Sequence, residues 1–204
     1  MRAFRSHADG ARKAYNTMLA LVKAVMGQRA AERSYGLAGD ALTPALDWSL
    51  PGLRREWNRR KDDAAPWWAE NSEEAYNSGL DALARGLDAW SKSRKGERAG
   101  AATGFPKFKS ARSRRSVRFT TGAIRAEADR HHVTLPRVGT IRTHESTRKL
   151  ARRIEAGTAR ILSAALSEDS SGRWFCSFQV LVRRPVSVPG HVGAGAPAVG
   201  VDVG

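Results

Sequence analysis

The stretch SEEAYNSGLDALARGLDAWSKS, residues 72–93, carries the strongest structural signal in this sequence. Its large apolar residues recur in steps of four and three, at Tyr76, Leu80, Leu83, Leu87 and Trp90. Side chains at this spacing lie on one face of an α-helix. The pattern therefore predicts a helix whose apolar stripe is covered by neighbouring helices.

The residues before this stretch also have a helical pattern. From Asp9, which we take as an N-cap, apolar residues follow the same spacing as far as Met26. Another helix is expected to begin after Ser49. We therefore predict a helical lobe over residues 1–95.

After this stretch, the period of the apolar pattern changes from helical to two. Residues 96–116, rich in Gly, Ser, Lys and Arg, predict a basic linker between domains. The short alternating runs that follow are typical of antiparallel strands and predict a small β-barrel over 117–185, with a basic helix at about 146–155. A linker at 186–198 and the segment VGVDVG at 199–204 complete the chain. The expected fold class is α+β.

Composition excludes several classes of protein. With 41% hydrophobic residues in 204, the chain can form a core, which excludes a fully disordered basic tail. No run approaches the roughly 20 apolar residues that span a bilayer, and MRAFRSHADG lacks the apolar stretch of a secretory signal. The single Cys176 excludes an internal disulfide framework. We expect a cytoplasmic, nucleoid-associated protein with no membrane partner.

The excess positive charge is concentrated in one region. The formal net charge is +15, and residues 91–160 hold 19 basic and 5 acidic side chains, against 13 and 12 in residues 1–90. Clustered Lys and Arg are typical of surfaces that bind the phosphates of nucleic acids. The alternative for residues 91–115 is a flexible basic linker that binds nothing specific.

Two basic clusters are candidate nucleic-acid-binding sites. The first lies at GFPKFKSARSRRSVRF, residues 104–119, where Phe105, Phe108 and Phe119 could stack an unpaired base or could pack beneath the loop. The second leads into the basic helix, whose N-terminus adds its own attraction for phosphate. The alternative is that the basic face of this helix is only solvated. The candidates are Lys92, Arg94, Lys95, Lys107, Phe108, Lys109, Arg112, Arg114, Arg115 and Arg118 in the first cluster and Arg142, His144, Arg148, Lys149, Arg152 and Arg153 in the second.

Asp202 is the one candidate for metal chemistry. A carboxylate within the apolar segment VGVDVG needs compensation, and a divalent cation is one way to supply it. So short a motif also occurs by chance. The sequence shows no second carboxylate placed near Asp202, no Ser/His/Asp arrangement and no phosphate-binding glycine loop with a lysine.

Taken in order, the motifs resemble the N-terminal half of the TnpB family, the OrfB-type transposon-encoded proteins related to type V CRISPR effectors. The similar segments are RKAYN at 12–16, GFPKFKS at 104–110, VRFTTGAIR at 117–125, LPRVGTIRTHES at 135–146, GRWFCSFQV at 172–180 and VGVDVG at 199–204. The resemblance implies a helical recognition lobe and a wedge domain of the oligonucleotide-binding barrel type. It also implies that VGVDVG is the first strand of a RuvC domain, which has an RNase H-like fold.

The resemblance also implies a function. Members of the family are RNA-guided DNA endonucleases of transposons, so guide RNA and DNA are the expected partners. Their RuvC site uses three acidic residues to hold two Mg²⁺ ions. Asp202 matches the first catalytic carboxylate and Mg²⁺ ligand, but only in a complete domain. We expect no cofactor in this chain and consider a separate polypeptide that carries the rest of RuvC.

The departures from the family give a narrower expectation. The later acidic residues of RuvC and an opening wedge strand are missing, so we expect a transposase-like fragment, truncated at both ends, that binds nucleic acid without independent nuclease activity. A decayed gene, a partial gene model and a split protein are alternative origins. The alternative functions are a stand-alone regulator derived from such a nuclease, an inactive transposon relic and a general RNA-binding protein of ribosomal type.

Overall fold

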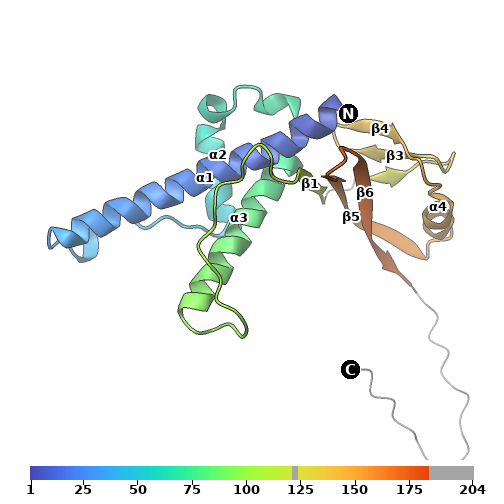
Figure 1. Cartoon of the computed structure of the whole chain (residues 1–204). Coiled ribbons are helices and arrows are strands. Elements are labelled where there is room, and N and C mark those ends of the chain that lie inside the picture. The colour runs from blue at the N-terminus through green and yellow to red at the C-terminus, as the bar shows by residue number, and fades with distance from the viewer. Residues whose placement is uncertain (121–123, 184–204) are drawn as a thin grey trace, which may run out of the picture.

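The computed structural model describes residues 1–120 and 124–183 of the chain (Figure 1). The predicted linker at 186–198, the predicted strand at 199–204 and Asp202 lie outside the described residues. Three helices pack together at one end of the chain, and six strands with a fourth helix form the other end. The helices are α1 (Arg2–Ser34), α2 (Leu50–Ala64), α3 (Glu73–Arg94) and α4 (Arg148–Glu155).

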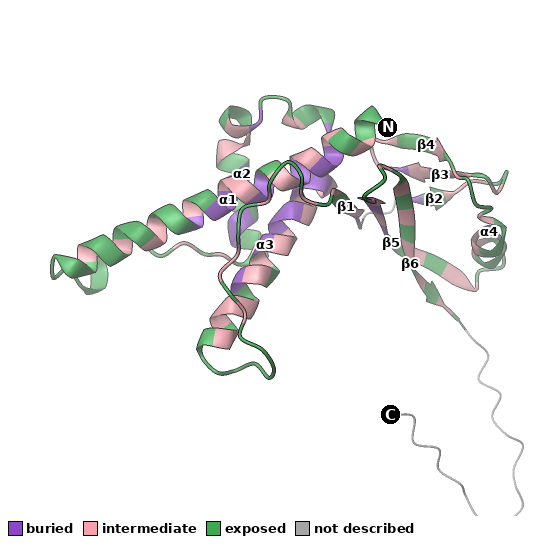
Figure 2. Cartoon of the chain, in the orientation of Figure 1, coloured by how far each residue is buried: buried purple, intermediate pink, exposed green. Residues whose placement is uncertain are grey.

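The helix predicted from residues 72–93 is confirmed as α3. The Ser72 hydroxyl caps its N-terminus by accepting a hydrogen bond from the Glu74 backbone N–H. The predicted apolar stripe is buried against α1 and α2 from Tyr76 to Leu87, and Trp90 at its end is half-buried (Figure 2). The predicted start of α2 is also confirmed, because the Ser49 side chain caps it. No helix among the described residues is long and apolar enough to cross a membrane.

The predicted start of α1 at Asp9 was wrong, because the helix begins at Arg2. The additional turns lie against the strands, where the Phe4 ring packs edge-on against Trp174 at 5.4 Å between centroids. His7 is also buried there. The Asp9 carboxylate does not cap a helix but lies 3.4 Å from the Arg12 guanidinium. Packing against a distant strand therefore extends the helix beyond the boundary that the local pattern predicted.

The strands form two antiparallel sheets of three strands each. One has the order β1-β5-β6 and the other β2-β3-β4. The bounds are β1 Ser116–Phe119, β2 Arg125–Ala126, β3 His132–Leu135, β4 Gly139–Arg142, β5 Ala159–Glu168 and β6 Trp174–Val182. The predicted alternation of β6 is confirmed, since half-buried and exposed residues alternate along its whole length.

The predicted closed barrel is not formed by the described residues. The two sheets share a core that includes Phe119, Leu135 and Leu166, but no strand of one sheet pairs with a strand of the other. A barrel needs every strand to be hydrogen-bonded on both sides. The β2 strand has two residues and pairs with β3 over only those two, so it offers little edge for closure. The fold class α+β stands, with two packed sheets in place of the barrel.

Candidate nucleic-acid interface

The basic linker between α3 and β1 is held against the helices. The Asn16 side chain donates a hydrogen bond to the Lys109 carbonyl oxygen at 2.8 Å and accepts one from the Lys109 N–H at 2.9 Å. The Phe105 ring packs edge-on against Trp90, with centroids 4.8 Å apart. The linker therefore contacts α1 at Lys109 and α3 at Phe105, and these contacts do not test the alternative that it binds nothing specific.

The three phenylalanines considered for base stacking differ in exposure. Phe119 is fully buried and Phe105 is half-buried on Trp90, so both belong to the core. Phe108 is 51% exposed, and the Lys23 ammonium lies 5.0 Å from its ring centroid. Of the three, Phe108 alone presents an open ring. Lys23 lies 85 positions earlier in the chain, so no sequence pattern could have placed it beside Phe108.

Many cations of the first cluster already have partners. Lys92 lies 2.9 Å from Asp88, and Arg115 lies 2.8 Å from Glu168. Lys95 is 4.0 Å from Glu97, Arg94 stacks on Trp90, and Arg118 donates to Gln179 at 2.8 Å. Among the described residues, Lys107, Arg112 and Arg114 have no carboxylate partner. Within these residues, Arg94 and Arg118 also lack a carboxylate partner, but the Trp90 ring and the Gln179 side chain already hold them.

Lys109 is a partly buried member of the first cluster. Its ammonium lies 4.3 Å from the Tyr15 ring centroid, and burial lowers the pKa of this ammonium. Its backbone holds the linker to Asn16. This lysine therefore connects the linker to α1, and its charge is only partly exposed to solvent.

The second cluster is more exposed. Arg142 and His144 lead into α4, where Ala151 is buried and Leu150 and Ile154 are half-buried. Arg148, Lys149, Arg152 and Arg153 are all exposed on the remaining surface of α4. None of these four has an ion-pair partner within the part of the chain that the structure describes. The predicted apolar and basic faces of this helix are both present.

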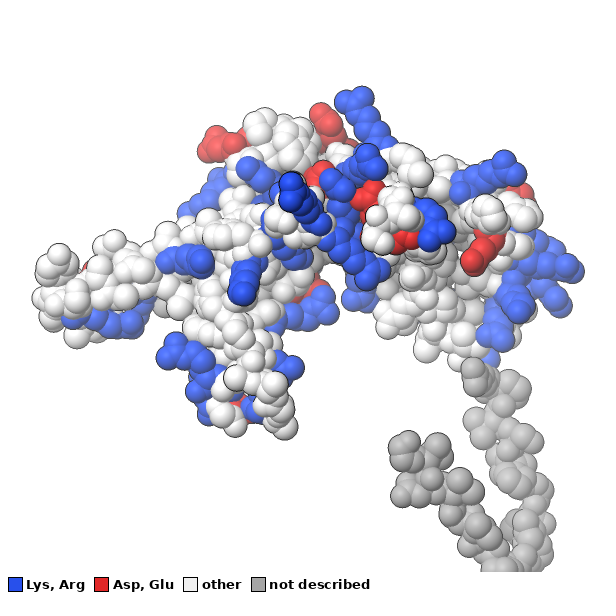
Figure 3. Space-filling model, in the orientation of Figure 1, with Lys and Arg blue, Asp and Glu red and all other residues white. Residues whose placement is uncertain are grey.

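The two clusters lie on different parts of the molecule. The linker runs along α1 and α3, whereas α4 lies at the far end of the sheets (Figure 1). Basic side chains gather around α4 and also in the notch between the helices and the sheets (Figure 3). In this view, the basic side chains around α4 are separated from those in the notch.

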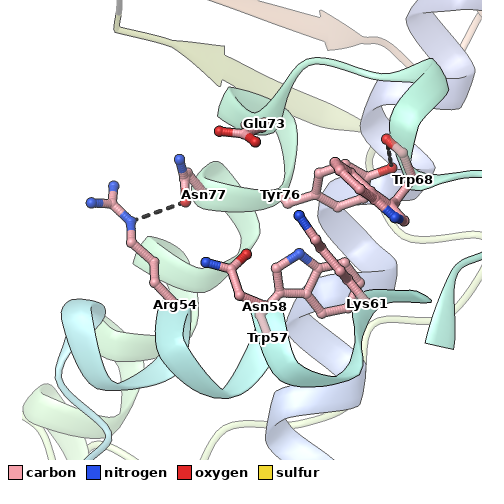
Figure 4. A pocket seen from close by; sticks show the side chains of 8 residues that line it. All are labelled: Arg54, Trp57, Asn58, Lys61, Trp68, Glu73, Tyr76 and Asn77. Carbon is pink, nitrogen blue, oxygen red and sulfur yellow. Dashed lines mark hydrogen bonds between the residues drawn. The ribbon is translucent and has the colours of Figure 1, made fainter. Parts of the chain in front are cut away.

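A pocket of about 150 Å³ between α2 and α3 was not predicted (Figure 4). The Trp57 and Tyr76 rings stack at its base with centroids 5.2 Å apart. The Arg54 guanidinium donates a hydrogen bond to Asn77 at 2.9 Å, and the Lys61 ammonium lies 3.4 Å from the Trp68 ring centroid. Trp57 and Tyr76 are only 3% and 2% exposed, and the volume is below the roughly 300–1,000 Å³ of ligand pockets, so this hollow belongs to the packing of the two helices. The sequence pattern predicted these aromatics as core residues. It could not predict the hollow between them, because the hollow forms only where two helices meet.

The described residues give no support for metal or thiol chemistry. Within residues 1–120 and 124–183, no group of three or more His, Cys, Asp or Glu side chains could hold a metal ion. Burial raises the pKa of the Cys176 thiol to about 11, so this thiol is protonated and unreactive at neutral pH.

Comparison with known proteins gives a relative in two strains of Mycobacterium tuberculosis. Both strains have a protein with the name "Putative RNA-guided DNA endonuclease", and each is 39% identical to the chain over 210 aligned positions. No family model matches the chain. The alignment covers 97% of the chain but 42% of each relative. The chain is therefore similar, over almost its whole length, to about two fifths of proteins named for RNA-guided DNA cleavage.

Proposed function

We propose that this chain binds guide RNA and DNA as the nucleic-acid-binding part of an RNA-guided nuclease of the TnpB/OrfB kind. The observation that carries the proposal is the set of four α4 cations, which are exposed and have no carboxylate partner among the described residues. A net charge of +15 and the similarity to proteins named RNA-guided DNA endonuclease support the same conclusion.

The geometry favours contacts to the nucleic-acid backbone. Lys and Arg side chains neutralise phosphates and release counterions, which gives affinity without sequence readout. The linker presents Lys107, Arg112 and Arg114 from a segment that Asn16 and Phe105 already hold in place. Because this segment is ordered beforehand, binding loses less conformational entropy. The separate α4 surface would contact a second stretch of backbone.

We further propose that residues 1–204 by themselves do not cleave DNA. Two-metal cleavage requires several carboxylates around both ions. VGVDVG supplies only Asp202, which would act as the first Mg²⁺ ligand when a polypeptide with the remaining RuvC residues completes the site. Asp202→Ala should leave nucleic-acid binding unchanged, and the purified chain with Mg²⁺ should leave plasmid DNA intact. Cleavage that disappears on Asp202→Ala would contradict this proposal.

The experiment for the binding proposal replaces Arg148, Lys149, Arg152 and Arg153 with Gln. Affinity for structured RNA and for duplex DNA should fall, and the slope of log K against log salt should decrease by about 0.9 per lost contact on duplex and about 0.7 on single strands. The measurement is fluorescence anisotropy between about 50 and 200 mM salt. RNA that copurifies with the wild type should also be dominated by one structured species.

The matched control replaces four arginines that are already paired with carboxylates, namely Arg55, Arg59, Arg60 and Arg85. It removes the same formal charge without removing an unpartnered cation. An equal loss in both variants would show that α4 acts only through total charge. An unchanged salt slope in the α4 variant would return this helix to the solvated-face interpretation.

A further inference from the structure

The outer face of the β1-β5-β6 sheet carries Arg118 of the first basic cluster, and Arg114 of the same cluster donates a hydrogen bond to Ser167 on it at 3.4 Å. Along β6, Trp174, Cys176 and Phe178 turn toward the core between the sheets. The alternate residues Phe175, Ser177, Gln179 and Leu181 are exposed on the other face. This face is therefore polar, apart from Phe175 and Leu181, which are 50% and 58% exposed.

The strand register defines what surrounds Phe175. Phe175 pairs with Ser167, which pairs with Ser116 on β1. The next row on this face consists of Arg118, Ala165 and Ser177. Rows on one face are about 6.6 Å apart along a strand. Small side chains therefore lie between the Phe175 ring and Arg118, and the ring is not covered by its neighbours in the sheet.

Arg118 is fixed in orientation on this face. Its Nη2 donates to the Gln179 Oε1 at 2.8 Å, and its Nε donates to the Ser163 Oγ at 3.3 Å. The Ser163 hydroxyl also donates to Gln179 at 3.2 Å. None of these partners is a carboxylate, so the guanidinium keeps its net charge while its plane is held.

The charged side chains exposed on this face are all basic. Arg160, paired with Leu181, adds a second cation to this face. The one acidic residue within these strands is Glu168, which is buried and already bound to Arg5 and Arg115. The outer face therefore attracts anions, because no carboxylate in its strands opposes the arginines.

We propose that this face binds single-stranded RNA, with one unpaired base stacked on Phe175, the adjoining backbone near Arg118 and a later part of the strand near Arg160. Exposed aromatic rings on sheets stack bases in RNA-binding modules, while basic side chains beside them neutralise the phosphates. The inference rests on the proposed function and adds a further RNA-binding surface to it. A protein partner fits less well, because Phe175 and Leu181 lie about 20 Å apart along β6 and form no continuous apolar patch.

The experiment compares Phe175→Leu with the wild-type full chain. The probes are a fluorescein-labelled 12-mer of oligouridine RNA, the same length of oligothymidine DNA and a 12-base-pair DNA duplex. Oligouridine should bind about tenfold more weakly to Phe175→Leu, because a base stack is lost. Duplex affinity and the salt slope should not change, because the substitution removes no charge. Phe175→Trp should restore or strengthen oligouridine binding.

Leu181→Ser is the matched control, since it alters an equally exposed apolar side chain on the same face of β6. It should bind oligouridine as the wild type does. Unchanged oligouridine affinity in Phe175→Leu, an equal loss in Leu181→Ser or a loss confined to oligothymidine would overturn the inference. If the wild type binds both RNA and duplex, and Phe175→Leu binds them with the same affinities, only this inference fails. If the wild type binds no probe, the proposed function fails.

Discussion

At the scale of single residues, His7 connects α1 to the start of α3. Its side chain is 1% exposed. The Nδ1 lies 2.8 Å from the Ala3 carbonyl oxygen, and the Nε2 lies 3.1 Å from the Ser72 backbone nitrogen, whose N–H needs an acceptor. This geometry requires the neutral imidazole with its proton on Nδ1. Burial lowers the pKa of His7 below 6.5, and the positive charge of Arg137 lowers it further.

The depressed pKa of His7 predicts acid-sensitive stability. Unfolded chains bind a proton at this histidine more readily than the folded protein, so its contribution to stability is present above pH 6.5 and is lost as pH falls. His7→Phe should reduce the free energy of unfolding by about 1–3 kcal/mol at pH 7, because the Ser72 N–H loses its acceptor. The substitution should also weaken the dependence of the unfolding free energy on pH below pH 6.5. Urea unfolding at pH 5 to 8 measures both effects.

Exposed His144 provides the control for this prediction. His144→Gln should retain the wild-type dependence of stability on pH. If His7→Phe showed the same slope below pH 6.5 as the wild type, protonation of His7 would not be the cause of acid sensitivity.

At the scale of elements, small residues allow α1 and α3 to approach closely. Gly79 on α3 faces the backbone of Ala11 on α1, and a Cβ at position 79 would overlap the Ala11 carbonyl oxygen. Gly10 similarly lies against the Tyr76 ring. The apolar stripe of α3 reaches α1 because these positions carry no larger side chain. The helix pattern predicted the stripe but not the partner backbone that approaches it.

Gly79→Ala should therefore destabilise the helical part, although alanine favours helices. The two helices must separate to admit the methyl group, and overpacking of this kind costs about 1–3 kcal/mol. Gly27→Ala is the control, because Gly27 is exposed on α1 and nothing lies within 4 Å of its added Cβ. That change should stabilise the protein by about 0.5–1 kcal/mol. Urea unfolding followed by tryptophan fluorescence measures the change in unfolding free energy for both variants. A change of the same sign in both would contradict the prediction.

At the scale of the whole molecule, Glu168 joins the helices, the linker and the sheet. It lies at the end of β5, is 7% exposed and accepts hydrogen bonds from Arg5 at 3.1 Å and Arg115 at 2.8 Å. The hydrogen bond from Arg115, followed by that from Arg5, lowers the pKa of the Glu168 carboxyl. Arg115 also lies 3.7 Å from Asp9 on α1. These contacts connect parts of the chain that are more than 50 residues apart.

Glu168→Gln should weaken this connection between the two parts of the molecule. Loss of the charge leaves Arg115 with a weaker partner at a partly buried position, so the Tm should fall by about 5 °C. Glu145→Gln, at an exposed position without an ion pair among the described residues, should leave the Tm unchanged. Thermal unfolding followed by circular dichroism makes the comparison. Equal Tm values for Glu168→Gln and the wild type would show that the pair contributes nothing measurable.

Local periodicity predicted most helices and strands. The elements that differ from the prediction do so because of long-range contacts. The start of α3 and the faces of β6 followed directly from apolar spacing. The first two turns of α1 did not, because segments far along the chain half-bury Phe4 and fully bury His7. Barrel closure was also wrong, because the number of strands does not determine whether their edges pair.

By itself, the sequence determined the α+β class, the apolar stripes of the helices, the alternation of the strands and the concentration of positive charge in residues 91–160. Each depends on residue type and spacing within a short window. Only the tertiary structure decided that Arg115 is paired with Glu168, that the α4 cations have no such partner among the described residues, and that Phe108 and Phe175 keep open rings. The physical reason is that burial and charge pairing depend on residues far apart in sequence, which only the folded chain brings together.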